Sequence, residues 1–158
     1  SDLDNVTFDR QFDLIWCGSL LTHLCQDDIL KLFNLFSRSI SEKGMAVFTA
    51  HGDFVAKRLA AEYEFYGLRE PEAERLAKIY AANGFAYGSY ELEETYGEVD
   101  LMDSNYGVSL TSPVWINKKL SKVDGIRQVF FRPQGWDDHQ DVYAVVRQLS
   151  GSTGDPAP

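Results

Sequence analysis

The sequence lacks the features that mark membrane-spanning and secreted proteins. None of its apolar runs approaches the roughly 20 residues that a membrane helix needs, and the N-terminus shows no basic-then-apolar signal pattern. Only two cysteines are present, Cys17 and Cys25, in or beside the most apolar part of the chain. Two thiols in this setting indicate free, buried and reduced side chains, so we expect a cytoplasmic protein.

Positive charge is also scarce. The formal net charge is -9, and no Lys or Arg occurs between Ile79 and Asn117. The same span carries the acidic residues Glu91, Glu93, Glu94, Glu98, Asp100 and Asp103. An acidic surface repels phosphate backbones, so we expect no nucleic-acid partner. The alternative interpretation of this span is a solvated loop that aids solubility.

What the sequence does contain is a βαβ pattern near its start. The apolar run Phe12–Cys17 is typical of a strand covered on both faces, and it stops at Gly18 and Ser19, where the chain can turn. Residues 26–40 predict an amphipathic helix, because apolar side chains recur at helical spacing. After a predicted turn at 41–44, Met45–Ala50 predicts a second buried strand, parallel to the first.

The rest of the chain predicts three more helices and a terminal pair of strands. Their ranges are 53–67, 71–83 and 112–122 for the helices, and 126–132 and 141–147 for the strands. Residues 87–108 predict an irregular, aromatic and acidic segment, which is typical of a functional loop or a mobile region. The eight-residue joint between the last two strands requires an antiparallel pair. Residues 150–158 are rich in Gly, Ser and Pro and predict a disordered tail.

These elements favour an α/β fold with helices flanking a sheet. In such a sheet the strand Phe12–Cys17 would lie at an open edge, although it is apolar on both faces. Unpaired edges invite association, so we expect another segment to lie beside it.

Three segments resemble class I S-adenosylmethionine-dependent methyltransferases. Residues 12–24 resemble the family's fourth-strand segment, in which an acidic residue after an aromatic one, an apolar strand and a small turn precede a Leu-x-His-Leu helix entry. Residues 41–48 are similar to the segment before and within strand five, although Lys43-Gly44-Met45 lacks the family's proline and second glycine. Residues 135–142 are similar to the last hairpin of a bacterial branch. The resemblance covers residues 1–148.

The resemblance implies a partial Rossmann-like sheet. The family orders its strands 3-2-1-4-5-7-6, with strand seven antiparallel between five and six, and the four strands of this chain correspond to 4, 5, 6 and 7. Residues 1–149 would then be the C-terminal half of a methyltransferase-like domain, with residues 150–158 as the tail. Strand one of the family would lie beside Phe12–Cys17.

The resemblance also implies an S-adenosylmethionine cofactor and a small-molecule methyl acceptor. The family holds the cofactor over a glycine-rich loop, and this sequence contains no Gly-x-Gly pair. We therefore expect a truncated methyltransferase that binds the cofactor poorly alone. The alternative is a non-catalytic methyltransferase-like module that pairs through its exposed strand edge, with a second copy or with a separately encoded half.

Candidate cofactor-binding residues lie where such sheets bind ligands, at the carboxyl ends of the strands. Cys17, Gly18 and Ser19 stand at that end of the first strand, and the resemblance implies that they face the sulfonium side of the cofactor. A plain strand-to-helix turn is the alternative. Asp2 could lie near the adenine by the same resemblance.

Two histidines are candidate catalytic bases, because a histidine near its ordinary pKa accepts a proton at neutral pH. They are His23, shortly after the first strand, and His51, just past the second; the alternative is that each packs or caps a helix start. His139 stands among aspartates, but neighbouring loop residues rarely converge on a metal, so we expect no metal site. Four tyrosines either form a lid over a substrate or pack the 87–108 segment: Tyr87, Tyr90, Tyr96 and Tyr106.

Overall fold

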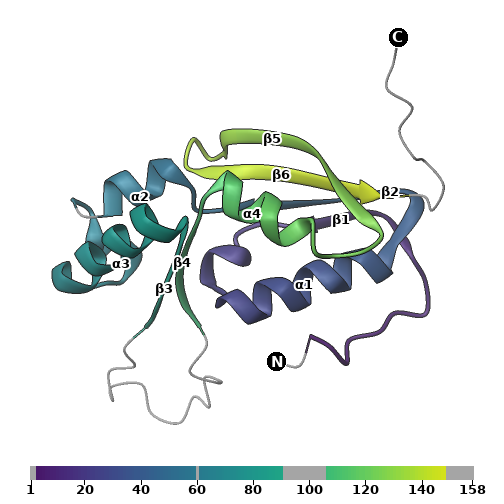
Figure 1. Cartoon of the computed structure of the whole chain (residues 1–158), viewed down its shortest axis with the longest axis horizontal. Helices are drawn as coiled ribbons and strands as arrows, with labels where there is room; N and C mark the ends of the chain where they lie inside the picture. The colour runs from purple at the N-terminus through teal and green to yellow at the C-terminus, as the bar shows by residue number, and fades with distance from the viewer. Residues whose placement is uncertain (1–2, 60, 91–105, 149–158) are drawn as a thin grey trace.

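A computed structural model describes residues 3–59, 61–90 and 106–148 of the chain. Its elements, in chain order, are β1 (Phe12–Cys17), η1 (Leu21–His23), α1 (Gln26–Ser39), β2 (Ile40–Ala50), α2 (Asp53–Leu59), η2 (Tyr63–Tyr66), α3 (Glu70–Asn83), β3 (Phe85–Ser89), β4 (Gly107–Thr111), α4 (Pro113–Leu120), β5 (Ile126–Trp136) and β6 (Gln140–Arg147) (Figure 1).

The main sheet has four strands in the order β1-β2-β6-β5. β1 runs parallel to β2, and β6 lies antiparallel between β2 and β5. This is the order 4-5-7-6 that the resemblance implies, and the predicted α/β sheet flanked by helices is confirmed. Among the described residues, β1 pairs with β2 alone, so its other edge has no strand beside it.

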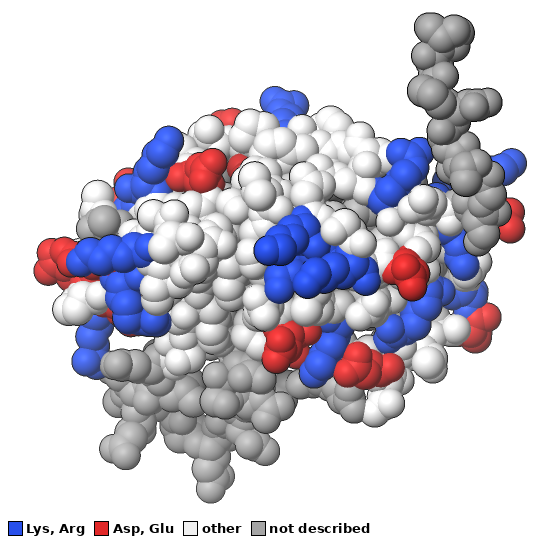
Figure 2. All heavy atoms as spheres, in the orientation of Figure 1, with Lys and Arg blue, Asp and Glu red and all other residues white. Residues whose placement is uncertain are grey.

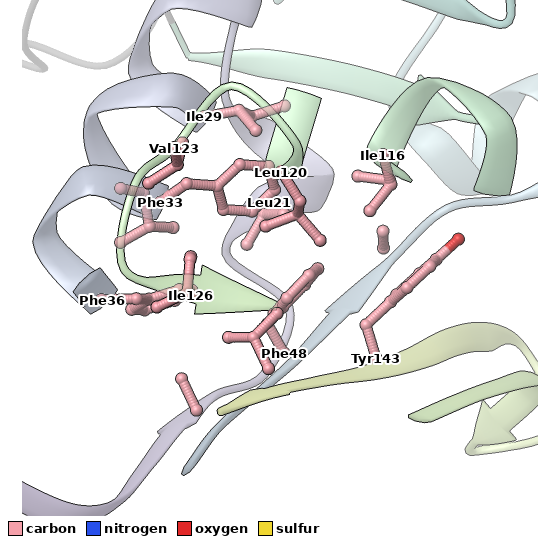
Figure 3. Close-up of a cluster of buried hydrophobic side chains, with 14 of the residues drawn as sticks. Leu21, Ile29, Phe33, Phe36, Phe48, Ile116, Leu120, Val123, Ile126 and Tyr143 are labelled. Atoms are coloured by element: carbon pink, nitrogen blue, oxygen red, sulfur yellow. The ribbon is translucent and has the colours of Figure 1, made fainter. Parts of the chain in front are cut away.

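One face of this sheet packs against α1 and α4 (Figure 1). The rings of Phe48 and Tyr143 stack at a centroid distance of 5.2 Å, and Phe33 from α1 lies 5.4 Å from Phe48. Figure 3 shows these side chains directed from the sheet and from the helices into one cluster. Each such side chain stabilises the fold by roughly 1.5–3 kcal/mol through burial.

The described residues between 53 and 111 (53–59, 61–90 and 106–111), called here the inserted unit, form a second, smaller core. α2, η2 and α3 pack on the two-stranded sheet β3-β4. Its fully buried aliphatic residues include Val55, Leu59, Leu76 and Leu110. Thr111 N–H donates to the carbonyl of His51 at 2.8 Å and so ties the end of β4 to the end of β2. The unit therefore stands at the carboxyl end of β2.

The prediction that residues 87–108 are irregular is wrong at both ends. β3 pairs with β4 from Phe85↔Thr111 to Ser89↔Gly107. Both strands are only five residues long and contain Gly and Ser, so their local sequence carries little strand signal. Their pairing comes from packing on α3. The acidic residues between them and Tyr96 lie outside the described residues.

The predicted turn at 41–44 is also wrong, because β2 begins at Ile40. Its pairing with β1 shifts between Phe12↔Ile40 and Leu14↔Met45. A Cβ at Gly44 would lie 2.5 Å from the Phe12 carbonyl oxygen. Close backbone approach therefore requires glycine at this irregularity of the strand. In the sequence the same glycine indicates a turn.

Two other boundaries differ from the prediction. The helix expected over 53–67 is split, because α2 ends at Leu59 and the short η2 ends at Tyr66, followed by Gly67 with φ +66°. The loop expected over 133–140 is shorter, because β5 continues to Trp136. Asp137 and Asp138 have φ of +54° and +48°, and the His139 N–H donates to the Trp136 carbonyl at 3.0 Å, so the chain reverses in a tight turn over residues 137–139.

The surface over α1 and α4 mixes both signs of charge (Figure 2), with basic side chains gathered over the end of α4. Lys118 and Lys119 lie in that last turn, where the helix dipole favours cations. Both cysteines are free thiols. In the part of the chain that the structure describes, no helix has the length and apolarity to cross a membrane.

Candidate functional site

The carboxyl end of β1 closes in a strained turn at Ser19. This residue has φ +54°, in the left-handed region that non-glycine residues rarely adopt. Its N–H donates to Thr49 Oγ1 at 2.8 Å, and Gln140 Nε2 donates to its Oγ at 2.9 Å. Thr49 Oγ1 in turn donates to Gln140 Oε1 at 2.5 Å. The network joins β1, β2 and β6, and backbone strain of this kind is common at functional sites.

Thr49 and Gln140 were not predicted as site residues. In the sequence, nothing distinguishes Thr49 from an ordinary strand residue. Gln140 is 121 positions away from Ser19. Only the position of β6 beside β2 brings them together. Ser19, in contrast, lies where the sequence placed it.

Cys17 and Gly18 have packing roles in this turn. The Cys17 thiol packs against the main core, and burial raises its pKa to about 11, so it is neutral at physiological pH. A Cβ at Gly18 would lie 2.8 Å from the indole ring of Trp16. Asp2 lies outside the described residues.

His23 is held between the main sheet and the inserted unit. Its Nδ1 lies 2.9 Å from the Gly107 carbonyl oxygen and 3.3 Å from the Tyr90 hydroxyl, and its ring stacks on Tyr106 at 4.8 Å. Donation from Nδ1–H to the carbonyl places the lone pair on Nε2. Tyr90 and Tyr106 therefore pack around His23. The Gly107 carbonyl, which can only accept, favours this tautomer.

His51 is 6% exposed at the end of β2. Burial, followed by the charges of His139 and His23, lowers its pKa to about 3, against a hydrogen bond with the Ser109 backbone. Its Nδ1 has no hydrogen-bond partner among the described residues. The ring is therefore a neutral imidazole across the physiological range.

His139 joins this site although the sequence predicted no role for it. It lies in the turn between β5 and β6, and its ring stacks on Tyr66 at 5.8 Å with Nε2 3.4 Å from the Tyr66 hydroxyl. Phe54 and Phe65 contact the same ring edge-on. Burial and then the Arg58 charge lower its pKa. The aspartates near His139 in the sequence do not indicate this aromatic environment.

A buried carboxyl group completes the cluster. Asp141 is 3% exposed, and its Oδ1 accepts from the Gln134 N–H at 3.0 Å. Burial raises its pKa. A Cβ at Gly52 would overlap its carboxylate, so only glycine fits after His51. Within the described residues, no three His, Cys, Asp or Glu side chains converge as a metal site would require.

Among the described residues, this arrangement offers no activated nucleophile. The thiol of Cys17 is neutral, and the imidazoles of His51 and His139 are uncharged. The rings of Phe65 and Tyr66 from η2 lie against the ring of His139 from the β5–β6 turn, on one side of this cluster. Proton acceptance beside a positioned substrate is the chemistry that these residues support.

Comparison of the sequence with protein-family models and with curated proteins gave no match. Solved structures do match the fold. The glycopeptide N-methyltransferase MtfA complexed with (S)-adenosyl-L-methionine superposes with a TM-score of 0.54 at 11% identity, covering 94% of this chain and 59% of that chain. The PH0226 protein from Pyrococcus horikoshii OT3 has a TM-score of 0.54 at 10% identity, covering 94% and 57%. The mitomycin 7-O-methyltransferase MmcR has a TM-score of 0.53 at 13% identity, covering 94% and 33%.

The chain thus spans between a third and three fifths of the length of these three proteins. At 10–13% identity the likeness concerns the fold. Its sheet order and these superpositions agree with the resemblance found in the sequence. The chain has a class I methyltransferase-like fold.

Proposed function

We propose that residues 1–149 form the C-terminal half of an S-adenosylmethionine-dependent methyltransferase that acts on a small molecule. One observation carries the proposal: β6 lies antiparallel between β2 and β5, in the order that the resemblance implies for strands 4-5-7-6. Two of the solved proteins that share the fold are named as methyltransferases of a glycopeptide and of mitomycin. These names support a small-molecule acceptor.

We propose that the turn after β1 faces one side of the cofactor. Gly18 and Ser19 turn sharply at the carboxyl end of β1, where the backbone can approach a ligand closely. S-adenosylmethionine, when bound, supplies an electrophilic methyl group. Because the sequence has no Gly-x-Gly loop for the methionine end, we expect the chain alone to bind it weakly.

His23 is the proposed base, and His51 is the weaker candidate, because a pKa of about 3 leaves its ring little affinity for a proton at neutral pH. An acceptor oxygen or nitrogen that takes up a methyl group loses a proton, and a neutral imidazole can accept it. Nε2 of His23 carries the lone pair in the tautomer in which Nδ1–H donates to the Gly107 carbonyl. Such a base adds to catalysis that consists mainly of positioning.

Titration by ¹H–¹⁵N NMR tests the cofactor site, because it detects weak binding and names the residues affected. With S-adenosylmethionine up to 10 mM, about a −3 kcal/mol interaction or stronger is visible. We expect the largest shifts at the amides of Gly18, Ser19 and Thr49. S-adenosylhomocysteine, which lacks the methyl group and the sulfonium charge, should shift the same amides.

Ser19→Ala is the matched variant, since it removes only the hydroxyl group that bonds to Gln140. It should weaken the shifts without changing the fold. The Lys78 amide, on an exposed residue in α3, serves as the internal reference. Absence of any shift at 10 mM, or shifts centred away from β1, would contradict the proposal.

A non-catalytic module is the second candidate, and the free edge of β1 favours it. A groove of about 300 Å³ runs along this strand and is lined mainly by apolar side chains, among them Phe8, Phe12 and Leu35. A strand from a second copy or from a separately encoded half could pair there. Edge pairing predicts a complex that Phe8→Glu weakens, measured by sedimentation velocity. A chain that binds cofactor as a monomer would contradict this candidate.

A further inference from the structure

Two carboxyl groups lie where the main sheet meets the inserted unit. Asp141 stands at the start of β6, and Asp53 is the first residue of α2. The hydroxyl of Tyr80 donates to Asp53 Oδ1 at 2.5 Å, and the Gln134 N–H donates to Asp141 Oδ1 at 3.0 Å. Both donors are neutral. In the part of the chain that the structure describes, neither carboxyl group forms an ion pair with Lys, Arg or His.

The hydroxyl group of Tyr143 is a third polar group at this junction. Tyr143 is fully buried, and its hydroxyl has no hydrogen-bond partner among the described residues. It follows Asp141 by two positions on β6, so the two side chains point to the same face of the sheet. Figure 3 shows the Tyr143 ring in the main core, with its oxygen at the end directed away from β6. Because a buried hydroxyl without a partner is costly, this one points to a bound ligand.

The three groups act on one another electrostatically. After burial, the charge of Asp141 and then that of Asp53 raise the pKa of Tyr143. The charge of Asp53 also raises the pKa of Asp141, in addition to burial and against the hydrogen bond from Gln134. A Cβ at Gly52 would overlap the Asp141 carboxylate, so this carboxylate lies against the joint that leads from β2 to Asp53. We call Asp53, Asp141 and Tyr143 the carboxyl cluster.

The carboxyl cluster is built by this chain alone. Asp141 is 3% exposed, and its burial and that of Tyr143 come from the two cores that the described residues form. Asp53 is exposed, so the cluster extends from the surface to the interior. No segment beside β1 is needed to enclose it. A buried carboxylate without a counter-charge is unfavourable, and a bound cation relieves this cost.

The ligand set favours a single positive charge. Carboxylate and hydroxyl oxygens are hard ligands for metal ions, and carboxylates also accept strong hydrogen bonds from an ammonium group. A divalent ion usually takes six or more oxygen ligands or a third charged side chain. Within the described residues, no third His, Cys, Asp or Glu joins the two aspartates in a metal-binding group.

We infer that the carboxyl cluster binds one small monovalent cation between the main sheet and the inserted unit. The cation is an alkali ion or the ammonium group of an amine, because both present one positive charge to the same oxygens. Bound there, it joins α2 to β6. The inference does not rest on the proposed function, because no cofactor takes part in it.

Thermal unfolding of the chain in different chloride salts tests this site. Sodium, potassium and methylammonium chloride are compared at about 100 mM with tetramethylammonium chloride, whose cation has no N–H group and is too large for the cluster. A cation that binds only the folded chain, with a dissociation constant of about 20 mM or lower, should raise the melting temperature by about 3 °C. A rise with sodium or potassium identifies a free ion, and a rise with methylammonium alone identifies an amine ligand.

Three variants connect the effect to the cluster. Asp141→Asn keeps the shape of the side chain and an oxygen for the Gln134 N–H, but should abolish the difference between salts. Tyr143→Phe removes only the unpartnered hydroxyl and should raise the dissociation constant of the cation about 5-fold. Asp138→Asn, on an exposed residue of the same hairpin, is the matched control and should retain the full effect.

Equal melting temperatures in all four salts would overturn the inference, as would a salt difference that persists in Asp141→Asn. Tyr143→Phe that is more stable than the wild type in every salt would also overturn it, because the hydroxyl would then be buried without a ligand. Circular dichroism confirms that each variant is folded before heating. These measurements contain no S-adenosylmethionine, so the inference and the proposed function fail separately.

Discussion

The ring of His51 lies 5.5 Å from the ring of His139, edge to face at an interplanar angle of 87°. One residue follows β2 and the other forms the β5–β6 turn, so 88 positions of sequence separate them. The contact exists because β6 pairs with β2 and starts beside its end. His51, a candidate base in the sequence, therefore lies beside a second neutral imidazole, that of His139.

This pair predicts how stability depends on pH. The pKa of His51 falls from an ordinary 6.5 to about 3 on folding, so the unfolded chain binds the proton more tightly. Its contribution to stability is complete above pH 6.5 and is lost as pH falls towards 3, at a slope of up to about 1.4 kcal/mol per pH unit. His51→Gln should flatten urea-unfolding stability between pH 6.5 and 4. A mutant slope equal to that of the wild type would show that His51 is not buried neutral.

The burial of Phe48 predicts how much stability the main core loses when its ring is removed. Its ring is fully buried and contacts Phe33, Phe36 and Tyr143. Phe48→Ala should lower the free energy of unfolding by about 3–5 kcal/mol, measured with urea. Phe65→Ala, which removes a ring of the same size that is 72% exposed, should cost far less. Similar losses for both would contradict the described packing.

The close backbone approach at Gly44 predicts that a side chain at this position strains the β1–β2 pairing. An alanine Cβ would lie 2.5 Å from the Phe12 carbonyl oxygen, so one strand must shift. Gly44→Ala should destabilise the fold by about 1–3 kcal/mol, through strain and lost β1–β2 hydrogen bonds. The neighbouring exposed Lys43→Ala should remain within about 0.5 kcal/mol of the wild type. Thermal unfolding of the two variants side by side checks the difference.

Substitutions at Ser19 test the strained turn after β1. A left-handed φ costs a non-glycine residue about 1–2 kcal/mol, which glycine avoids, while the hydroxyl contact with Gln140 is lost. Ser19→Gly should therefore be neutral or stabilising, whereas Ser19→Val should destabilise by more than about 1 kcal/mol because its branched side chain resists this conformation. Equal melting temperatures for the two variants would argue against the described turn.

The sequence by itself determined the elements whose signals are local. Continuous apolar runs predicted β1 and the core half of β2, helical spacing predicted α1, and the short joint after β5 predicted the antiparallel β5–β6 pair. The motif after β1 placed Gly18 and Ser19 correctly at the end of a strand. These features depend on neighbours within a few positions, which a periodic pattern records.

Tertiary structure alone decided the pairings between distant residues. β3 and β4 are short and weakly patterned, and their strand conformation depends on packing against α3. Gln140 reaches Ser19, and His139 reaches His51, only because β6 lies between β2 and β5. Burial then sets the pKa of His51, and burial depends on the whole fold. Local spacing cannot encode such contacts, because their free energy arises from segments brought together across the entire chain.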